Sequence, residues 1–184
     1  MTLASETLVR TTILQGDAKA SADERVIMST VLGSCVATCL YDPVARVGGM
    51  NHYLLAQPLD QSASNLDSSY GLFLMELLIN EMLKLGAEKR QMKARLYGGA
   101  NMAAGLGRIG SDNAAFARKF LRDESIQTVF EDLEGNCARR IEFSPANGLV
   151  RARKVAGEVP PPVTPVRQNP QGNPQAGLGD VDLF

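Results

Sequence analysis

Short apolar runs separated by turn-forming residues fill most of the chain and predict a protein built largely from short strands. Several runs are rich in the β-branched and aromatic residues that favour extended structure. The predicted strands cover residues 8–14, 25–30, 36–41, 48–55, 93–97, 126–131, 138–143 and 149–154. Turn-rich residues separate the last three runs, which predicts that these strands form a meander.

One longer segment has the spacing of apolar positions that is typical of a helix. This helix begins near Ser68 or Ser69, either of which could cap it, and it stops at Gly86, a residue favoured just after a helix. Its polar stripe is narrow: Glu76, Asn80 and Lys84. We therefore expect most of its circumference to be buried.

A second, shorter helix is predicted over residues 113–121, with Ser111 or Asp112 as its cap. Strands interrupted by two main helices, with an antiparallel finish, favour the α+β class, and specifically a layered α/β sandwich with mixed or antiparallel sheets. We expect one folded domain over residues 1–156. From residue 157 to 184 the chain is rich in Pro, Gly and Gln and lacks a packing pattern, which predicts a disordered tail.

Composition narrows the class of protein further. The formal net charge of −1 comes without any dense basic cluster, so we expect no nucleic-acid binding. No segment approaches the length of an apolar membrane span, and the first 20 residues lack an apolar signal region, so we expect neither membrane insertion nor secretion. Three cysteines without a close-paired pattern fit free thiols in a reducing compartment, which predicts a cytoplasmic protein.

The single histidine of the chain, His52, follows Cys35 in the most organised stretch of the sequence. A thiol and an imidazole are the two groups that thiolate catalysis needs near neutral pH. Between them, Asp42 and Pro43 occupy the first two positions of a predicted type I turn. A hairpin centred on that turn places Cys35 directly opposite His52, where Cβ atoms are about 4.5–5.5 Å apart.

Each of these residues also has a purely structural interpretation. Cys35 could be a small buried hydrophobic residue, and His52 a hydrogen-bonded core histidine. Cys39 lies on the same strand face as Cys35 and is predicted to pack in the core, and Cys137 lies beside a turn as an exposed or half-buried thiol. Together the four residues have the ligand count of a zinc site, but they lack its close-paired spacing, so we expect neither a metal nor a cofactor.

Several segments resemble the chemoreceptor glutamine deamidase family, CheD. They are Leu32-Gly33-Ser34-Cys35-Val36-Ala37, Cys39-Leu40-Tyr41-Asp42-Pro43, Gly48-Gly49-Met50-Asn51-His52, Tyr70-Gly71, Leu96-Tyr97-Gly98-Gly99-Ala100-Asn101-Met102 and Ile109-Gly110. The resemblance is collinear from about residue 8 to residue 154, and it implies the layered sandwich fold of that family. It also implies hydrolysis of selected glutamine side chains of methyl-accepting chemotaxis receptors to glutamate.

The resemblance implies the roles of individual residues as well. It makes Cys35 the nucleophile and His52 the base, without a cofactor. The family also has an orienting hydroxyl, usually threonine, six residues before the cysteine; here that position is Ser29, and Thr30 follows it. As a hypothesis, Ser29 fixes the tautomer of the His52 imidazole.

Two loops complete the candidate site. Backbone N–H groups around Ser34 and Cys35 could hold an oxyanion, with Gly33 allowing the close approach. The segment containing Gly98, Gly99 and Asn101 lacks the lysine and the spacing of a phosphate loop. It could be only a tight turn, and the resemblance implies a loop near the active site or a partner surface.

The expected partners are the cytoplasmic domains of chemoreceptors and a CheC-type phosphatase. A second hypothesis is a non-catalytic chemotaxis adaptor that binds one of these partners. A third is another thiol hydrolase or acyltransferase that uses the same two residues on a different amide.

Overall fold

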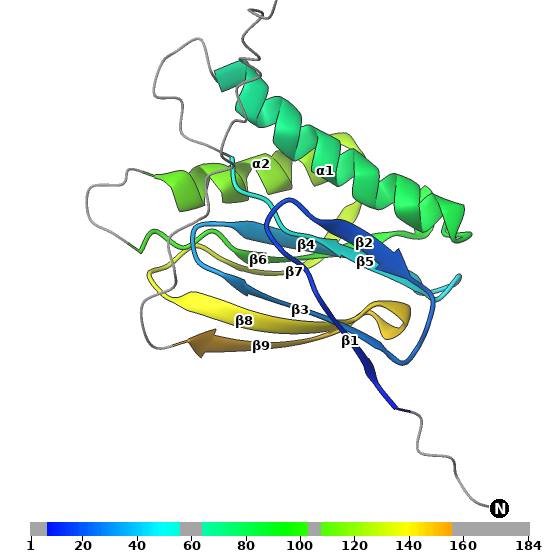
Figure 1. Ribbon diagram of the computed structural model, residues 1–184. Coiled ribbons are helices and arrows are strands. Elements are labelled where there is room, and N and C mark those ends of the chain that lie inside the picture. The colour runs from blue at the N-terminus through cyan, green and yellow to red at the C-terminus, as the bar shows by residue number, and fades with distance from the viewer. Residues whose placement is uncertain (1–6, 56–63, 103–107, 156–184) are drawn as a thin grey trace, which may run out of the picture.

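Two β-sheets pack face to face, and two helices cover the outer face of the larger sheet, so that the chain forms three layers (Figure 1). This architecture is seen in a computed structural model that describes residues 7–55, 64–102 and 108–155. The predicted tail, residues 157–184, lies outside the described residues. The α+β layered sandwich predicted from the sequence is confirmed.

The larger sheet has five strands in the order β2-β5-β4-β6-β7, with β6 and β7 parallel and the other neighbours antiparallel. Its strands are β2 (Ala18–Ser21), β4 (Val36–Asp42), β5 (Val47–Asn51), β6 (Lys93–Gly98) and β7 (Gln127–Leu133). The smaller sheet has the order β1-β3-β8-β9, with β1 and β3 parallel. Its strands are β1 (Val9–Thr12), β3 (Val26–Leu32), β8 (Ala138–Ser144) and β9 (Leu149–Val155).

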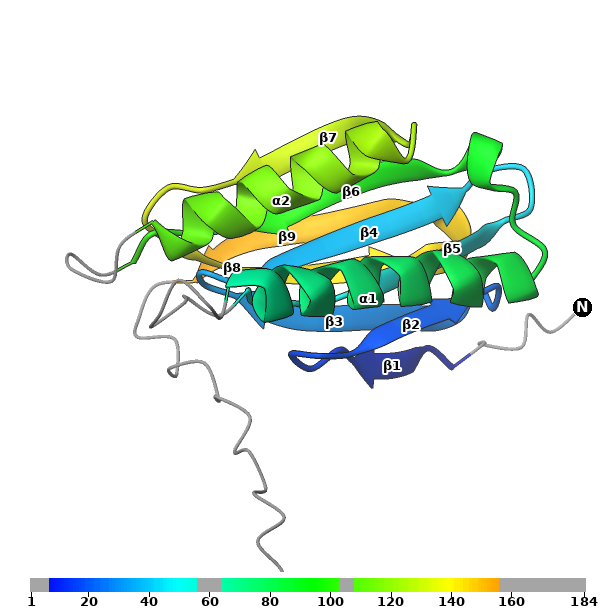
Figure 2. The ribbon, with the colours of Figure 1, turned by 90° about the horizontal axis from the view of Figure 1, so that it is seen from above.

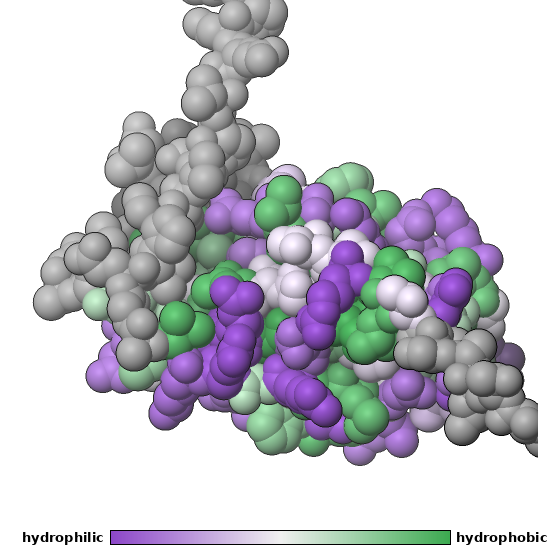
Figure 3. Space-filling model, turned by 60° about the horizontal axis from the view of Figure 1, so that its bottom comes forward, coloured by the Kyte–Doolittle hydropathy of each residue, from purple (hydrophilic) through white to green (hydrophobic). Residues whose placement is uncertain are grey.

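The two helices, α1 (Ser64–Lys84) and α2 (Ile109–Asp123), lie side by side over the five-stranded sheet (Figure 2). Short 3-10 turns occur at Lys89–Gln91 and Pro145–Asn147. Neither helix covers the outer face of the four-stranded sheet. Alternation along β8 and β9 places Arg140 and Arg153 opposite each other on that face, beside the pair Glu142 and Arg151. Figure 3, turned toward this side, shows strongly hydrophilic side chains among apolar ones.

Strand β4 lies between two hydrophobic clusters, and both of its faces are buried. One cluster fills the space between the five-stranded sheet and the helices, and it includes Leu40, Leu78 and Leu121. The other fills the space between the two sheets, and it includes Met28 and Phe143. Since both layers contact β4, this strand organises the core.

Several sequence predictions need correction. The last three strands do not form a meander, because β7 pairs in parallel with β6 in one sheet while β8 and β9 form a hairpin in the other. Strand β2 was not predicted, because its four residues contain no apolar run. Each helix begins earlier than expected: the backbone of Ser68 and Ser69 lies within α1, and Ser111 and Asp112 lie within the first turn of α2.

The prediction that most of α1 is buried is also wrong. Leu74, Leu78 and Met82 are fully buried, whereas Leu72 and Phe73 are 43% and 56% exposed. The helix therefore presents apolar residues on both sides, and only one side packs on the sheet.

The two sides of α1 predict different costs of truncation. Leu78→Ala removes a fully buried side chain from the cluster beneath the helix and is expected to lower the free energy of unfolding by about 2–5 kcal/mol. The control Leu72→Ala removes the same atoms from an exposed position and is expected to cost less than about 1 kcal/mol. Urea denaturation measures both, and equal costs would contradict the packing described here.

Candidate active site

The β4–β5 hairpin has a longer loop than the sequence predicted. Asp42 pairs with Val47, which leaves a four-residue loop over residues 43–46. The Asp42 carboxylate accepts hydrogen bonds from two backbone N–H groups of that loop, at 2.8 and 3.0 Å. Arg46 adopts a left-handed conformation, with φ of 57°, as the chain enters β5. The pairing is therefore displaced by two residues, and the prediction that Cys35 lies directly opposite His52 is wrong.

The displaced pairing still places Cys35 and His52 on one face. The neighbouring residues Val36 and Tyr53 form a bridge in which each N–H donates to the other's carbonyl, at 3.0 and 2.9 Å. Cys35 and His52 are thus in diagonal positions of the pair, where Cα atoms are about 7–8 Å apart and longer side chains can meet. Their face of the larger sheet is the one turned toward the smaller sheet.

Neighbouring segments hold His52 from both its backbone and its ring. The His52 N–H donates to the Asp17 carbonyl at 3.1 Å, and the His52 carbonyl accepts from the Gly16 N–H at 2.8 Å. The ring atom Nδ1 lies 2.9 Å from Thr30 Oγ1 and 3.4 Å from the Ile13 carbonyl oxygen. A carbonyl only accepts hydrogen bonds, so this contact favours the tautomer with hydrogen on Nδ1.

In that tautomer, His52 Nε2 carries the lone pair. This atom is buried and has no hydrogen-bond partner among the described residues. Nε2 is thus a free acceptor on the sheet face that carries Cys35, although within the described residues the thiol hydrogen bonds to Gln15 and not to His52.

The hydroxyl beside His52 belongs to Thr30, whereas the sequence analysis placed Ser29 there. Side chains alternate along β3, so Thr30 points into the space between the sheets and Ser29 points to the opposite face. Ser29 is half-buried and pairs in register with Thr12 and Glu142 of its own sheet. The proposed role of Ser29 in fixing the imidazole is therefore corrected to Thr30.

Cys35 is 7% exposed, and its thiol donates a hydrogen bond to Gln15 Oε1 at a sulfur–oxygen distance of 3.6 Å. Burial raises the pKa of the Cys35 thiol to about 11, although its own backbone N–H acts in the opposite direction. Burial also lowers the pKa of His52, and the Ile13 carbonyl and the charge of Asp17 oppose that shift. Both groups are therefore neutral at pH 7. Gln15 was not recognised from the sequence, because only the folded turn brings it to the thiol.

Carbonyl hydrogen bonds fix the loop that carries Cys35. The carbonyl of Gly33 accepts from the Ala100 N–H at 2.8 Å, that of Ser34 from Asn113 Nδ2 at 2.9 Å, and that of Cys35 from the Gly99 N–H at 2.7 Å. Three consecutive carbonyl groups are thus tied to the turn that follows β6 and to α2. The loop is held against the glycines that the sequence analysis had singled out.

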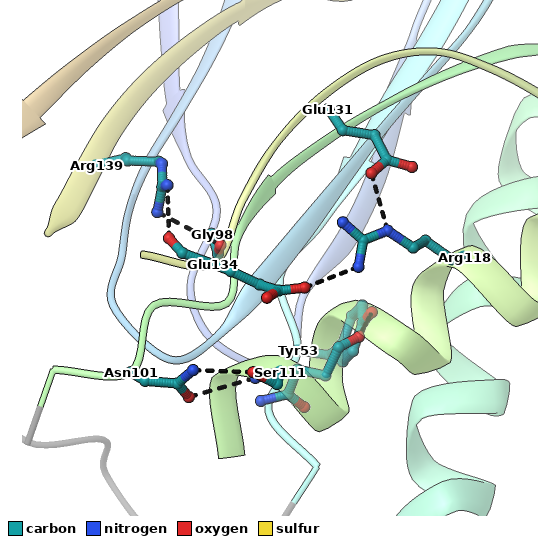
Figure 4. A network of polar contacts seen from close by, with 9 residues as sticks. Tyr53, Gly98, Asn101, Ser111, Arg118, Glu131, Glu134 and Arg139 are labelled. Atoms are coloured by element: carbon teal, nitrogen blue, oxygen red, sulfur yellow. Dashed lines mark hydrogen bonds and ion pairs between the residues drawn. The ribbon is translucent and has the colours of Figure 1, made fainter. Parts of the chain in front are cut away.

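Gly98 and Gly99 support this loop through their backbones. Both have left-handed φ values, 107° and 66°, and a Cβ atom at Gly98 would lie 2.2 Å from the Cys35 carbonyl oxygen. Asn101 is exposed, and its side chain bonds to Ser111 at the start of α2 (Figure 4). These contacts give the glycines a supporting position behind the nucleophile loop.

The far side of Gly98 is held as well. Its carbonyl accepts from the Glu134 N–H at 2.8 Å and from the buried Arg139 side chain at 3.4 Å (Figure 4). Arg139 also donates to the Glu134 carbonyl at 2.7 Å. Figure 4 shows Arg118 joined to the carboxylate of Glu134, so a polar network backs the glycine turn.

The thiols of the chain do not assemble a metal site. Cys39 is fully buried between the sheets, as expected for a packing residue, and Cys137 is half-buried beside Asn136. Within residues 7–55, 64–102 and 108–155, no three side chains from His, Cys, Asp or Glu are grouped closely enough to hold a metal ion.

A substitution at Gly98 is expected to disturb this support strongly. Gly98→Ala combines an unfavourable φ with a clash against the Cys35 carbonyl, which predicts a loss of at least about 2–3 kcal/mol in the free energy of unfolding. Gly86→Ala is the matched control, because Gly86 has a φ of 93° but no atom within 4 Å of the added Cβ, and it is expected to cost about 1 kcal/mol. Denaturation curves that show equal losses would contradict the close approach.

Comparisons with known proteins find a family model and several relatives that match this chain. The family model described as "CheD chemotactic sensory transduction" matches residues 54–154. A "Probable chemoreceptor glutamine deamidase CheD" from Zymomonas mobilis is 51% identical over 155 residues, covering 82% of this chain and 83% of the relative. A relative of the same name from Caulobacter vibrioides is 45% identical over 179 residues, covering 97% of this chain and 95% of the relative.

A further relative of that name, from Cereibacter sphaeroides, is 48% identical over 174 residues, covering 95% of this chain and 84% of the relative. Among solved structures, a Neisseria meningitidis protein of family DUF152 has a TM-score of 0.42 at 16% identity, over 65% of this chain and 53% of that one.

No helix of the described segments is long and apolar enough to cross a membrane. The extent and identity of the matches to its relatives show that this chain belongs to the CheD family.

Proposed function

We propose that this protein is a glutamine deamidase that hydrolyses selected glutamine side chains of chemoreceptors to glutamate. The names of its relatives support the reaction and the substrate class. The observation that carries the mechanism is the state of His52. Its Nδ1 is hydrogen-bonded to Thr30 and faces the Ile13 carbonyl, and its Nε2 is buried on the sheet face of Cys35 without a partner in the described part of the chain.

In the first step, Cys35 Sγ attacks the carboxamide carbon of the substrate glutamine while His52 Nε2 takes the thiol proton. The carbonyl oxygen of the substrate becomes an oxyanion, and we assign the Cys35 N–H, which faces its own sulfur, as one donor to it. Gly33 and Ser34 shape the turn that presents this N–H. The imidazolium then protonates the amide nitrogen, the carbon–nitrogen bond breaks, and ammonia leaves a thioester on Cys35.

Water completes the reaction. Neutral His52 takes a proton from a water molecule, the hydroxide attacks the thioester carbon, and the carbon–sulfur bond breaks. The sulfur recovers its proton from His52, and glutamate is released. The balance is one glutamine and one water converted to one glutamate and one ammonia, so the cycle needs no cofactor.

Burial of Cys35 and His52 keeps both groups uncharged until the substrate is attacked. Because the thiol pKa lies far above neutral and burial lowers the imidazole pKa, a standing thiolate–imidazolium pair is disfavoured in the resting protein. The pair forms as the substrate is attacked. Thr30 and Ile13 then accept the Nδ1 hydrogen of the imidazolium, and Asp17 adds a favourable charge.

Two other functions stay open as competitors. The chain could act mainly as an adaptor that binds a CheC-type phosphatase or a chemoreceptor, or the same dyad could hydrolyse or transfer another amide. Three free cysteines suit the cytoplasm, where chemoreceptor signalling domains are found, so we place the reaction there.

The reaction predicts that both Cys35→Ala and His52→Ala abolish measurable ammonia release from chemoreceptor cytoplasmic fragments. Removal of the nucleophile leaves no covalent route, and loss of a general base costs about 10²–10⁴-fold in rate. Cys39→Ala is the control, since this buried thiol belongs to the core cluster rather than to the dyad. Mass spectrometry of receptor peptides should locate glutamate in place of glutamine without a change in peptide length.

The same Cys35→Ala protein separates catalysis from adaptor function. A fully active variant would end the proposed mechanism. If the inactive variant rescues a chemotaxis defect, the adaptor function, in which the protein acts by binding its partner, would be favoured. A change in peptide length would favour cleavage by another thiol hydrolase.

Thr30 is proposed as a positioning residue, and its test is matched with Ser29. Thr30→Val removes the hydroxyl beside Nδ1 at nearly constant volume and is expected to lower kcat by about tenfold or more, equivalent to about 1.4 kcal/mol, with little change in KM. The pH at which activity rises should shift as well, because the imidazolium loses an acceptor. Thr30→Ser should restore most of the rate.

Ser29→Ala is the control, because Ser29 points to the opposite face of β3. Its activity and pH profile should equal those of the wild type. The assignment of Thr30 would be overturned by a reversed pattern, with Ser29→Ala impaired and Thr30→Val active.

A further inference from the structure

A glutamine of the chain itself lies against the proposed nucleophile. The Cys35 thiol donates to Oε1 of Gln15, 3.6 Å away, and this contact is the only hydrogen bond of the Gln15 side chain among the described residues. Gln15 ends in a primary carboxamide, the same group as the proposed substrate. In the resting protein the thiol is therefore hydrogen-bonded to the same kind of group, a primary carboxamide, that it would attack in the substrate.

The backbone around Gln15 fixes this contact. Residues 14–17 form a turn in which the Asp17 N–H donates to the Leu14 carbonyl at 2.9 Å, with Gln15 and Gly16 at the central positions. The φ of 93° at Gly16 identifies a type II turn. Hydrogen bonds from Gly16 and to Asp17 join the same turn to the backbone of His52.

The Gln15 contact is also easy to break. A thiol is a weak donor, so the bond to Oε1 contributes little, and the half-buried side chain can turn toward solvent from a turn that stays in place. Among the described residues His52 Nε2 has no partner, and the thiol proton is donated to Gln15 in the resting protein. Because the thiol and the imidazole are both neutral, Gln15 can lie against Cys35 without proton transfer between Cys35 and His52.

We propose that the Gln15 carboxamide occupies the subsite that receives the substrate carboxamide, so that Gln15 is an internal pseudosubstrate which an incoming glutamine displaces. This inference rests on the proposed function for the identity of the substrate. The occupancy itself concerns only Gln15 and Cys35. A subsite that is filled for most of the time lowers the apparent affinity for substrate in proportion to the free fraction.

The first test reads the occupancy directly and needs no deamidase activity. Iodoacetamide carries a primary carboxamide, and its reaction with Cys35 is followed by mass spectrometry of the Cys35 peptide at mildly alkaline pH. Gln15→Ala is expected to raise this alkylation rate several-fold. Leu14→Ala is the matched control, because that side chain lies on the same turn but is 64% exposed.

Two internal checks guard this measurement. The half-buried Cys137 lies in another part of the chain, and its alkylation rate should be equal in all variants. Gln15→Asn keeps the turn and the amide but shortens the side chain, so it should behave as Gln15→Ala does. Equal Cys35 rates in wild type, Gln15→Ala and Gln15→Asn would overturn the proposal.

The second test uses receptor fragments. If Gln15 fills the subsite in about nine-tenths of the molecules, Gln15→Ala raises kcat/KM about tenfold, and the gain lies in KM. A fall in kcat/KM would overturn the proposal, because it would make Gln15 a group that assists the reaction. If wild-type protein releases no ammonia from any receptor fragment, the proposed function fails, and the alkylation rates alone decide the occupancy.

Discussion

Burial of β4 on both faces is the constraint from which the rest of the structure follows. Its strand neighbours and the two hydrophobic layers exclude water, so polar backbone groups at its ends need partners within the protein. At its start, the carbonyls of residues 33–35 meet this need through the turn that follows β6 and through α2. Cys35, the proposed nucleophile, therefore lies on a short loop whose backbone has little freedom. Precise placement of a reactive group follows from ordinary hydrogen-bond satisfaction.

The same constraint explains why the site lies between the sheets. One face of β4 and β5 packs on the helices, so side chains that reach toward β3 come from the other face. The ring of His52 thus meets Thr30 of the opposite sheet, and its backbone meets the turn that precedes β2. The position of the His52 imidazole thus depends on β3, on the turn before β2 and on the end of β5. The hydrogen bond between His52 and Thr30 joins the imidazole to both sheets.

Much of this arrangement could be predicted from residue types and their periodicity. The remainder depended on the register of the hairpin and on which face of a strand points inward. All strands except β2, both helices and the pair Cys35 and His52 follow from local patterns. The hairpin register does not, because a four-residue loop with left-handed Arg46 competes closely with the two-residue turn that Asp42 and Pro43 suggest. The choice between Ser29 and Thr30 depends on which face of β3 is inward, and a strand alternates at every residue. Gln15 depends on a tertiary contact that no local pattern encodes.

The neutral, nearly enclosed Cys35 has a consequence for the lifetime of the enzyme. Oxidation by peroxides begins at the thiolate and leads through sulfenic acid to irreversible products. A thiol with a pKa of about 11 and 7% exposure offers almost no thiolate to such oxidants at cellular pH. The sulfur of the proposed nucleophile is thus protected from oxidative loss in the absence of substrate. In the proposed mechanism the sulfur becomes reactive only when the substrate has bound, and before that it stays in the form that resists oxidation.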